Sequence, residues 1–144
     1  MRLGFNEAND RFCQGHTVMQ DLELCEKYGF DCIDIQSECL NRDLEKGIVT
    51  IEELGEWFAT HHLKMLSYNA LCFFNMKQTA EEKQAVMDEL DEIIRRCNIL
   101  GCKMIVVVPS QDMKARGLQP TRKEIREDAV AVLKEMVKKV EPHG

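Results

Sequence analysis

The sequence predicts an α/β fold: four consecutive βα units with parallel strands, which make half of a (β/α)8 TIM barrel. Four short apolar segments that are typical of strands alternate with four helix-start signatures along the 144 residues. An alternating strand and helix order indicates parallel strands joined by right-handed crossovers. Polar residues also recur near the ends of the strands, as the mouth of a barrel requires. Together these observations favour a half-barrel.

Each predicted helix begins at a capping box, in which a threonine hydroxyl and an acidic or amide side chain satisfy free backbone N–H groups reciprocally. The four boxes are Thr17–Gln20, Thr50–Glu53, Thr79–Glu82 and Thr121–Glu124. Apolar residues follow each box at intervals of three and four, which places them on one face of a helix. The sequence therefore predicts four amphipathic helices, each with one buried face.

Four strands are predicted around these helices, over residues 3–6, 32–36, 65–70 and 104–108. The last contains an unbroken run of β-branched residues, which suits a strand covered on both faces in a parallel sheet. Successive side chains of a strand point to opposite faces. Alternation predicts that one set faces the helices: Ile33, Ile35, Leu66 and Tyr68. The polar set should point to the other face: Asp34, Gln36, Ser67 and Asn69.

An open doubly wound sheet is the other architecture that this order of elements allows. Such a nucleotide-binding sheet carries a glycine-rich loop after its first strand, whereas here Asn6 is followed by Glu-Ala-Asn-Asp. We therefore expect residues 1–144 to be the N-terminal half of a single TIM-barrel domain, with strands one to four and helices one to four. A further helix-to-strand junction opens over residues 140–144, so we expect a longer β/α protein to continue from it.

Charge and composition exclude several classes of function. The formal net charge is −6, and lysine and arginine do not cluster, which argues against a nucleic-acid partner. No apolar run approaches the ~20 residues of a membrane span, and no signal peptide opens the chain. We therefore expect a cytoplasmic protein with no membrane partner. The seven cysteines form no C-x-x-C pair and are predicted to be small buried residues. The four histidines show no metal-binding spacing.

Three amides stand at the last positions of the first three strands, namely Asn6, Gln36 and Asn69. An amide offers both a donor and an acceptor, so these side chains could orient the hydroxyls of a substrate at a barrel mouth. The alternative is that they only satisfy backbone groups of the loops.

Two carboxylates and two aromatic rings follow the strands. Glu7 and Glu38 could reach the mouth as a base or a hydroxyl acceptor, although a solvated loop charge is the expected default. Phe73 and Phe74 follow the third strand. One ring is expected to shield a pocket from water, and the other to anchor the loop to the core.

Three stretches resemble the inosose isomerase branch of the xylose-isomerase-like superfamily, the sugar phosphate isomerases and epimerases. They are FNEA over residues 5–8, DLELCEKYGFDCIDI over 21–35 and HHLKMLSYNALCFFN over 61–75. Residues 100–109 and the closing residues 141–144 also fit this branch. The likeness spans essentially the whole chain, but only the first half of a family member.

The resemblance implies a metal-dependent isomerase or epimerase of a keto-sugar or cyclic polyol ketone, acting by enediolate proton transfer, with a place in inositol catabolism. It implies a divalent metal (Mn, Co, Zn or Mg) in the full-length parent. The family's metal ligands and catalytic carboxylates lie on strands five to eight, and no position of this chain matches them. We therefore expect no catalytic residue, no metal ligand and no activity in this chain alone. The resemblance carries over a substrate wall: Asn6, Gln36, Asn69, Phe73, Phe74 and Pro109.

Other partners and functions remain open at this point. The expected small-molecule partner is the keto-polyol or keto-sugar, and the open edges of a half-barrel should make the chain self-associate. An endonuclease acting at abasic DNA sites is similar in fold, but the negative charge of this chain argues against it. A non-catalytic half-barrel module is the third hypothesis.

Overall fold

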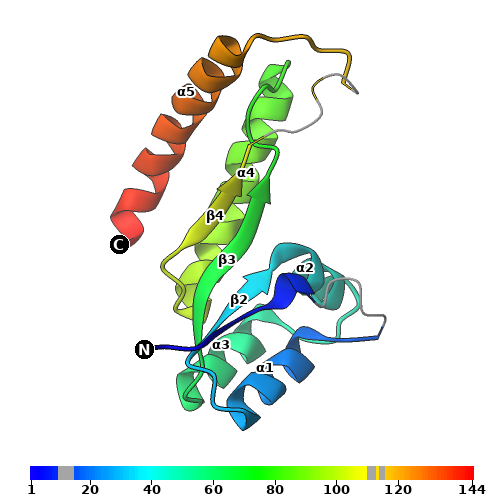
Figure 1. Ribbon diagram of the computed structural model, residues 1–144, viewed down its shortest axis with the longest axis vertical. Helices are drawn as coiled ribbons and strands as arrows, with labels where there is room; N and C mark the ends of the chain where they lie inside the picture. Colours follow the sequence, from blue (N-terminus) through cyan, green and yellow to red (C-terminus); the bar gives the residue numbers. More distant parts are fainter. Residues whose placement is uncertain (10–14, 110–112, 114–115) are drawn as a thin grey trace. The chain divides into compact units, whose positions relative to one another are not determined.

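The computed structural model describes residues 1–9, 15–109, 113 and 116–144. In chain order (Figure 1) the elements are β1 (Gly4–Asn6), η1 (Glu7–Asn9), α1 (Val18–Lys27), β2 (Cys32–Gln36), α2 (Ser37–Glu45), α3 (Ile51–Thr60), β3 (Lys64–Cys72), α4 (Ala80–Leu100), β4 (Ile105–Val108), α5 (Arg122–Val140) and η2 (Glu141–His143). The strands form one sheet in the order β1-β2-β3-β4. The strands are parallel, with the β1–β2 and β2–β3 pairs in defined register, so the predicted fold class is confirmed.

All four predicted capping boxes are formed. Thr17, Thr50 and Thr121 each accept from the backbone N–H three residues later, and the reciprocal bond is present in each case. At the start of α4, the backbone N–H of Glu82 donates to Oγ1 of Thr79 at 3.1 Å, and Oε2 of Glu82 accepts from the backbone N–H of Thr79 at 3.3 Å.

Helix α2 is the element that the sequence did not predict. Residue 38 was expected on a loop, but the chain turns directly from β2 into this helix, and Gln36 serves as its N-cap without a side-chain capping bond. The helix therefore carries no threonine signature. It nevertheless buries one stripe, which includes Cys39, Leu40 and Asp43. Two helices thus follow β2.

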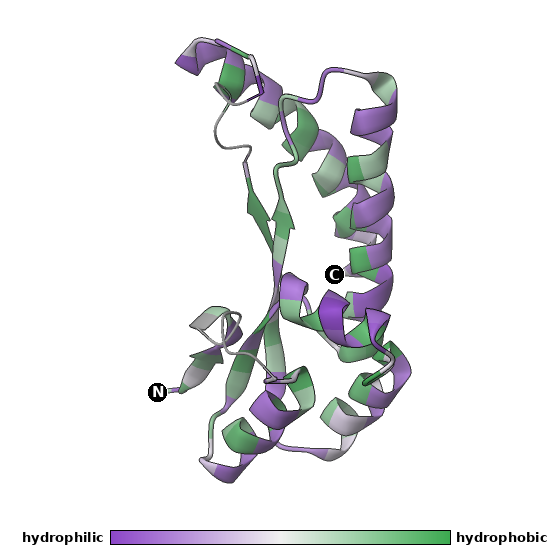
Figure 2. Cartoon of the chain, turned by 90° about the vertical axis from the view of Figure 1, so that its right-hand side faces the viewer, coloured by the Kyte–Doolittle hydropathy of each residue, from purple (hydrophilic) through white to green (hydrophobic). Residues whose placement is uncertain are grey.

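The chain folds into two compact units. One comprises Met1–Ala70 with Arg95–Val106, and the other Leu71–Ile94 with Val107–Gly144. In the first unit, Ile33 and Ile35 of β2 are fully buried, as are Leu22 of α1 and Leu54 of α3. Burying a side chain of this size contributes about 1.5–3 kcal/mol. Figure 2 shows apolar residues along much of the strands and a mixture of apolar and polar residues along the helices.

A bulge interrupts the register between β2 and β3. Ile33 pairs with Met65, but Asp34 pairs with Ser67, so Leu66 has no Cα partner on β2. The additional residue shifts the alternation of β3 by one position. Leu66 is 49% exposed, and the expectation that it faces the helices was wrong. The prediction for Tyr68 is confirmed, since its side chain is buried.

In the second unit, the residue that follows β3 is bonded to the end of β4. The N–H of Phe73 donates to the carbonyl of Val108 at 2.7 Å. Asp128 of α5 accepts from the N–H of Met76 at 2.6 Å. Within the described part of the chain, no helix is both long and apolar enough to cross a bilayer.

Candidate functional site

Asn69 lies inside β3, which extends to Cys72, so it is not the last residue of its strand as the sequence predicted. A polar network joins β2 and β3 through their side chains. Asp34 is its centre, because Oδ2 accepts from Nδ2 of Asn69 at 2.9 Å and Oδ1 accepts from the hydroxyl of Ser67. The register makes this possible: Asp34 lies opposite Ser67, and Gln36 lies opposite Asn69. The bond to Asp34 uses the amide donor of Asn69 and leaves its amide oxygen for another donor. Three polar side chains within β2 and β3 are therefore held together by hydrogen bonds, on the face that alternation assigned to them.

The other two amides behave differently from Asn69. The side chain of Asn6 is exposed, and its Oδ1 accepts from the N–H of Ala8 at 2.9 Å. This local turn matches the alternative reading, in which the amide satisfies a loop backbone group. Gln36 is 6% exposed and ends β2 opposite Asn69. The backbone therefore brings Gln36, but not Asn6, beside Asn69.

Glu7 is buried, which contradicts the expectation of a solvated loop charge. It has no exposed surface, and its Oε2 accepts from the backbone N–H of Gln36 at 2.6 Å. Burial raises the pKa of Glu7 to about 8, and the nearby carboxylates of Asp21 and Asp43 act in the same direction. Among the described residues, Oε1 has no hydrogen-bond partner. At neutral pH Glu7 is therefore mainly a neutral carboxylic acid. Glu38, in contrast, is exposed as expected.

The surroundings of Glu7 explain why its burial could not be predicted from the sequence. Asp43 of α2 is fully buried, accepts from the N–H of Val18 at 2.8 Å and pairs with Nε of Arg42 at 2.9 Å. Arg42 also donates to the carbonyl of His16 at 2.7 Å. These bonds hold the start of α1 against α2. Because α2 was not predicted, the sequence showed no cover for the residue that follows β1.

Phe73, Phe74 and Pro109 belong to the second unit. Phe73 is 50% exposed and Phe74 is 2% exposed, as expected for one open ring and one anchoring ring. Pro109 directly follows β4 and is exposed. Their contact with a substrate remains a prediction.

The described residues hold no cluster of three or more His, Cys, Asp or Glu side chains that could bind a metal. The network offers one carboxylate, Asp34, with a hydroxyl and an amide. This donor set alone does not fit the divalent metal that the resemblance implies.

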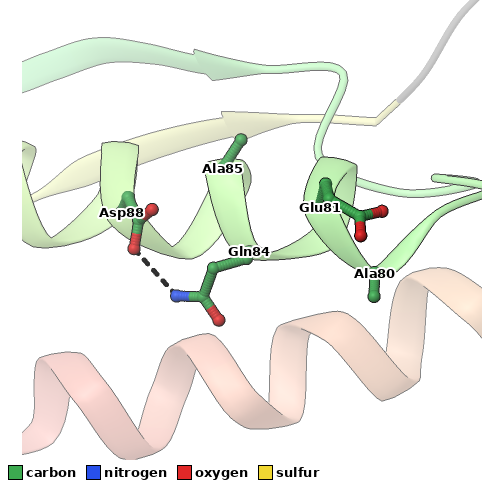
Figure 3. A pocket seen from close by; sticks show the side chains of 5 residues that line it. All are labelled: Ala80, Glu81, Gln84, Ala85 and Asp88. Carbon is green, nitrogen blue, oxygen red and sulfur yellow. Dashed lines mark hydrogen bonds between the residues drawn. The ribbon is translucent and has the colours of Figure 1, made fainter.

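Two of the hollows in the described part of the chain lie away from the network. One, of about 640 Å³, lies at the amino ends of the strands, where Gly4, Cys32 and Lys64 line it. In barrels this end serves stability. The other, of about 460 Å³, is a shallow depression on α4 (Figure 3), in which Nε2 of Gln84 donates to Asp88 at 2.8 Å. Charged side chains, among them Asp31, Lys64 and Lys103, line the first of them.

Curated relatives match the chain along its whole length. It is 34% identical over 144 residues to an inosose isomerase of Bacillus velezensis, and 31% identical to one of Halalkalibacterium halodurans. The chain spans about half the length of these relatives, 49% and 48% respectively.

Comparison with solved structures gives the same relationship. A crystal structure of the IOLI protein with a bound zinc atom matches with a TM-score of 0.86 and 34% identity, over 100% of this chain and 49% of that one. The probable 3-DHS dehydratase AsbF of Bacillus anthracis matches with a TM-score of 0.75 at 12% identity, over 99% of this chain and 49% of that one, which shows the fold alone. A profile of the xylose isomerase-like TIM barrel family matches residues 22–144. The chain therefore belongs to the xylose isomerase-like TIM barrel family and corresponds to the amino-terminal half of such a barrel.

Proposed function

We propose that a protein containing this half-barrel isomerises or epimerises a cyclic polyol ketone of the inosose type, and that residues 1–144 form part of the wall that binds the substrate. The hydrogen-bonded set Asp34, Ser67 and Asn69 carries this proposal. A polyol presents a ring of hydroxyls, each of which donates one hydrogen bond and accepts others. A carboxylate, a hydroxyl and an amide on neighbouring strands are suited to bind such a ring. The names of the relatives support the same substrate class.

The reaction moves a proton next to a carbonyl group, so it needs a base and a means of stabilising an enediolate. We assign these to the part of the barrel outside this chain, because the described residues hold no metal-binding cluster. The zinc bound in the IOLI structure supports a divalent metal in the complete protein, where it would supply a Lewis acid. The role of this chain is to bind hydroxyls and fix their orientation.

Within the wall, Asn69 and Gln36 are the proposed hydroxyl ligands. Asp34 has one lone pair on each oxygen already engaged, so it can accept a further bond while it holds Asn69 in place. Asn6 is a weaker candidate, because its side chain serves the local turn. Phe73 and Pro109, which are exposed, are proposed as apolar contacts with the sugar ring, and Phe74 as the anchor of their loop.

The test is a proton-exchange assay. The protein expressed from the complete reading frame is incubated with an inosose in D2O, and NMR follows deuterium incorporation beside the carbonyl and the appearance of an isomeric inosose. We expect both with the complete protein and neither with residues 1–144 alone. A complete protein that is folded by circular dichroism, loaded with zinc or manganese, and exchanges no proton of any inosose would refute the proposal.

A further inference from the structure

Helix α4 ends in a motif whose two contacting positions are both cysteines. The backbone N–H of Cys102 donates to the carbonyl of Cys97 at 2.9 Å, and Gly101 has the left-handed φ of +69°. This is a Schellman motif, in which a 6→1 hydrogen bond closes the helix and brings the side chains of its first and last residues into contact. In α4 that contact joins two thiols.

Two other helices end with the same backbone and provide an internal comparison. The N–H of Phe30 donates to Cys25 at the end of α1, and the N–H of Ile48 donates to Asp43 at the end of α2, each at 2.9 Å. Their contacting pairs are Cys25 with Phe30 and Asp43 with Ile48. Among the helix ends that the structure describes, only that of α4 places one cysteine against another.

The two thiols are already arranged as a donor and an acceptor. The thiol of Cys97 hydrogen-bonds that of Cys102, and the thiol of Cys102 donates to the carbonyl of Met104 at 3.2 Å. The bond between the thiols lowers the pKa of Cys102 and raises that of Cys97. The thiolate is the reactive form of cysteine. Cys102, which accepts the bond from Cys97, is the candidate attacking sulfur of the pair, and Cys97 the candidate resolving one.

We propose that Cys97 and Cys102 form a dithiol that hydrogen peroxide, or another small hydroperoxide, oxidises to an intrachain disulfide. The sulfur of Cys102 attacks one peroxide oxygen, the O–O bond breaks, and a sulfenic acid and one water result. The sulfur of Cys97 then attacks the sulfenic sulfur, the S–S bond forms, and the hydroxyl leaves with the Cys97 proton as a second water. Two thiols and one peroxide thus give one disulfide and two waters.

The burial of both thiols limits which oxidants can reach them. Cys97 is 5% exposed and Cys102 is 2% exposed. A hydroperoxide little larger than water can reach them through local opening, whereas a peptide disulfide such as oxidised glutathione cannot reach them in the folded chain. The same burial protects the sulfenic acid from other thiols, so Cys97 is the sulfur that resolves it.

The disulfide fits the fold. Bridged cysteines have Cα atoms about 4.4–6.8 Å apart, which suits residues in side-chain contact across a 6→1 turn. Oxidation removes the thiol donor from the carbonyl of Met104, but the N–H of Tyr68 still donates to that carbonyl at 2.8 Å. The pairing of β3 with β4 therefore survives. The oxidised chain should remain folded and should be restored by a reductant.

Peptide mapping tests the proposal. The folded chain is treated with hydrogen peroxide at pH 7, alkylated after denaturation, and digested with trypsin without reduction. Trypsin cleaves after Arg96 and Lys103, so both cysteines fall in peptide 97–103. We expect that peptide to lose two hydrogens and to take up alkylating agent only after reduction. Peptide 65–77, whose one cysteine is the more exposed Cys72, is the reference and should react several-fold more slowly.

Matched variants separate a reactive pair from two inert core thiols. Cys97→Ser should leave a Cys102 sulfenic acid that dimedone traps when it is added with the denaturant, and Cys102→Ser should leave Cys97 unreactive at the same dose. Circular dichroism before and after treatment verifies that the chain stays folded. The proposal is overturned if peptide 97–103 is alkylated at both cysteines at peroxide doses that oxidise Cys72, or if Cys102→Ser loses its remaining thiol as fast as the unmodified pair.

Discussion

The carboxyl group of Glu7 accepts a hydrogen bond from the backbone N–H of Gln36 at 2.6 Å, and the Glu7 side chain is fully buried. The bond ties the residue after β1 to the last residue of β2. Gln36 is also the N-cap of α2 and the register partner of Asn69. A buried acid thus supports the strand ends that the proposed substrate wall requires.

Replacing Glu7 by glutamine should stabilise the protein at alkaline pH. The pKa of Glu7 is about 8 in the folded chain and 4.5 in the unfolded chain. Between these values the unfolded state binds fewer protons, so the stability contributed by Glu7 falls as the pH rises from 4.5 to 8. At 1.36 kcal/mol per unit, the loss is at most about 5 kcal/mol. Glutamine keeps the acceptor for Gln36 and does not titrate.

Urea unfolding at pH 4.5, 6, 7 and 8.5 measures this effect. The stability of Glu7→Gln relative to the native chain should grow with pH and level off above the folded pKa. Glu38→Gln, an exposed carboxylate on α2, is the control and should change stability by less than about 0.5 kcal/mol. A pH-independent difference between Glu7→Gln and the native chain would contradict the buried neutral acid.

Asp43→Ala should be strongly destabilising. It removes the buried acceptor for the N–H of Val18 and for Nε of Arg42, whereas Arg42 keeps its bond to the carbonyl of His16. Leaving the buried N–H of Val18 without its acceptor costs about 1–3 kcal/mol. Asp91→Ala removes an exposed ion pair with Lys139 at 2.6 Å and should cost less than about 1 kcal/mol. Equal shifts of the two urea midpoints would show that the Asp43 network is not integral to the core.

Gly55→Ala should destabilise the chain, although alanine favours helices by about 1 kcal/mol. A Cβ at this position of α3 would lie 2.8 Å from Cγ2 of Ile99 and 3.0 Å from its carbonyl oxygen. Overpacking of this kind costs about 1–3 kcal/mol. Adding Ile99→Ala removes the side-chain clash and should recover part of the loss in a double-mutant cycle. A higher melting temperature for Gly55→Ala alone would contradict the close approach of α3 and α4.

Residues 1–144 alone should form a dimer. β1 and β4 are the edges of the sheet, and the first unit exposes the strand-region side chains Leu3, Leu66 and Met104, which are 56%, 49% and 52% exposed. A closed barrel has eight strands, and a second copy would supply the missing four. Sedimentation velocity at micromolar concentration should show a dimer that Leu66→Lys weakens. A folded monomer with native Leu66 would contradict this expectation.

The sequence predicted the fold to the extent that its signals were local. Threonine caps and strand periodicity involve residues within a few positions of each other, and these elements were predicted correctly. Helix α2 lacked such a cap, because Gln36 ends a strand and starts a helix at once. Without α2, the burial of Glu7 could not be predicted, since its cover comes from a distant segment. The exposure of Leu66 depends on a bulge that only pairing with β2 reveals.

The candidate site followed the same rule. Strand alternation placed Asp34, Ser67 and Asn69 on one face of the sheet. The hydrogen bonds that Ser67 and Asn69 donate to Asp34 agree with this placement. Alternation could not show that Asp34 organises the set, because this depends on the register between strands. Nor could it separate Asn69 from Asn6, whose side chain bonds locally to Ala8.

The kinetics of Asn69→Ala in the complete protein test most directly the central claim, that the polar side chains of β2 and β3 bind substrate. Loss of one buried hydrogen bond should cost about 1–3 kcal/mol, so kcat/KM for the inosose should fall by about 5- to 150-fold with little change in melting temperature. Asn41→Ala, which removes an exposed amide bound to Arg96 at 2.6 Å, should leave kcat/KM unchanged. Unchanged kcat/KM with a lowered melting temperature for Asn69→Ala would assign Asn69 to structure and contradict the account.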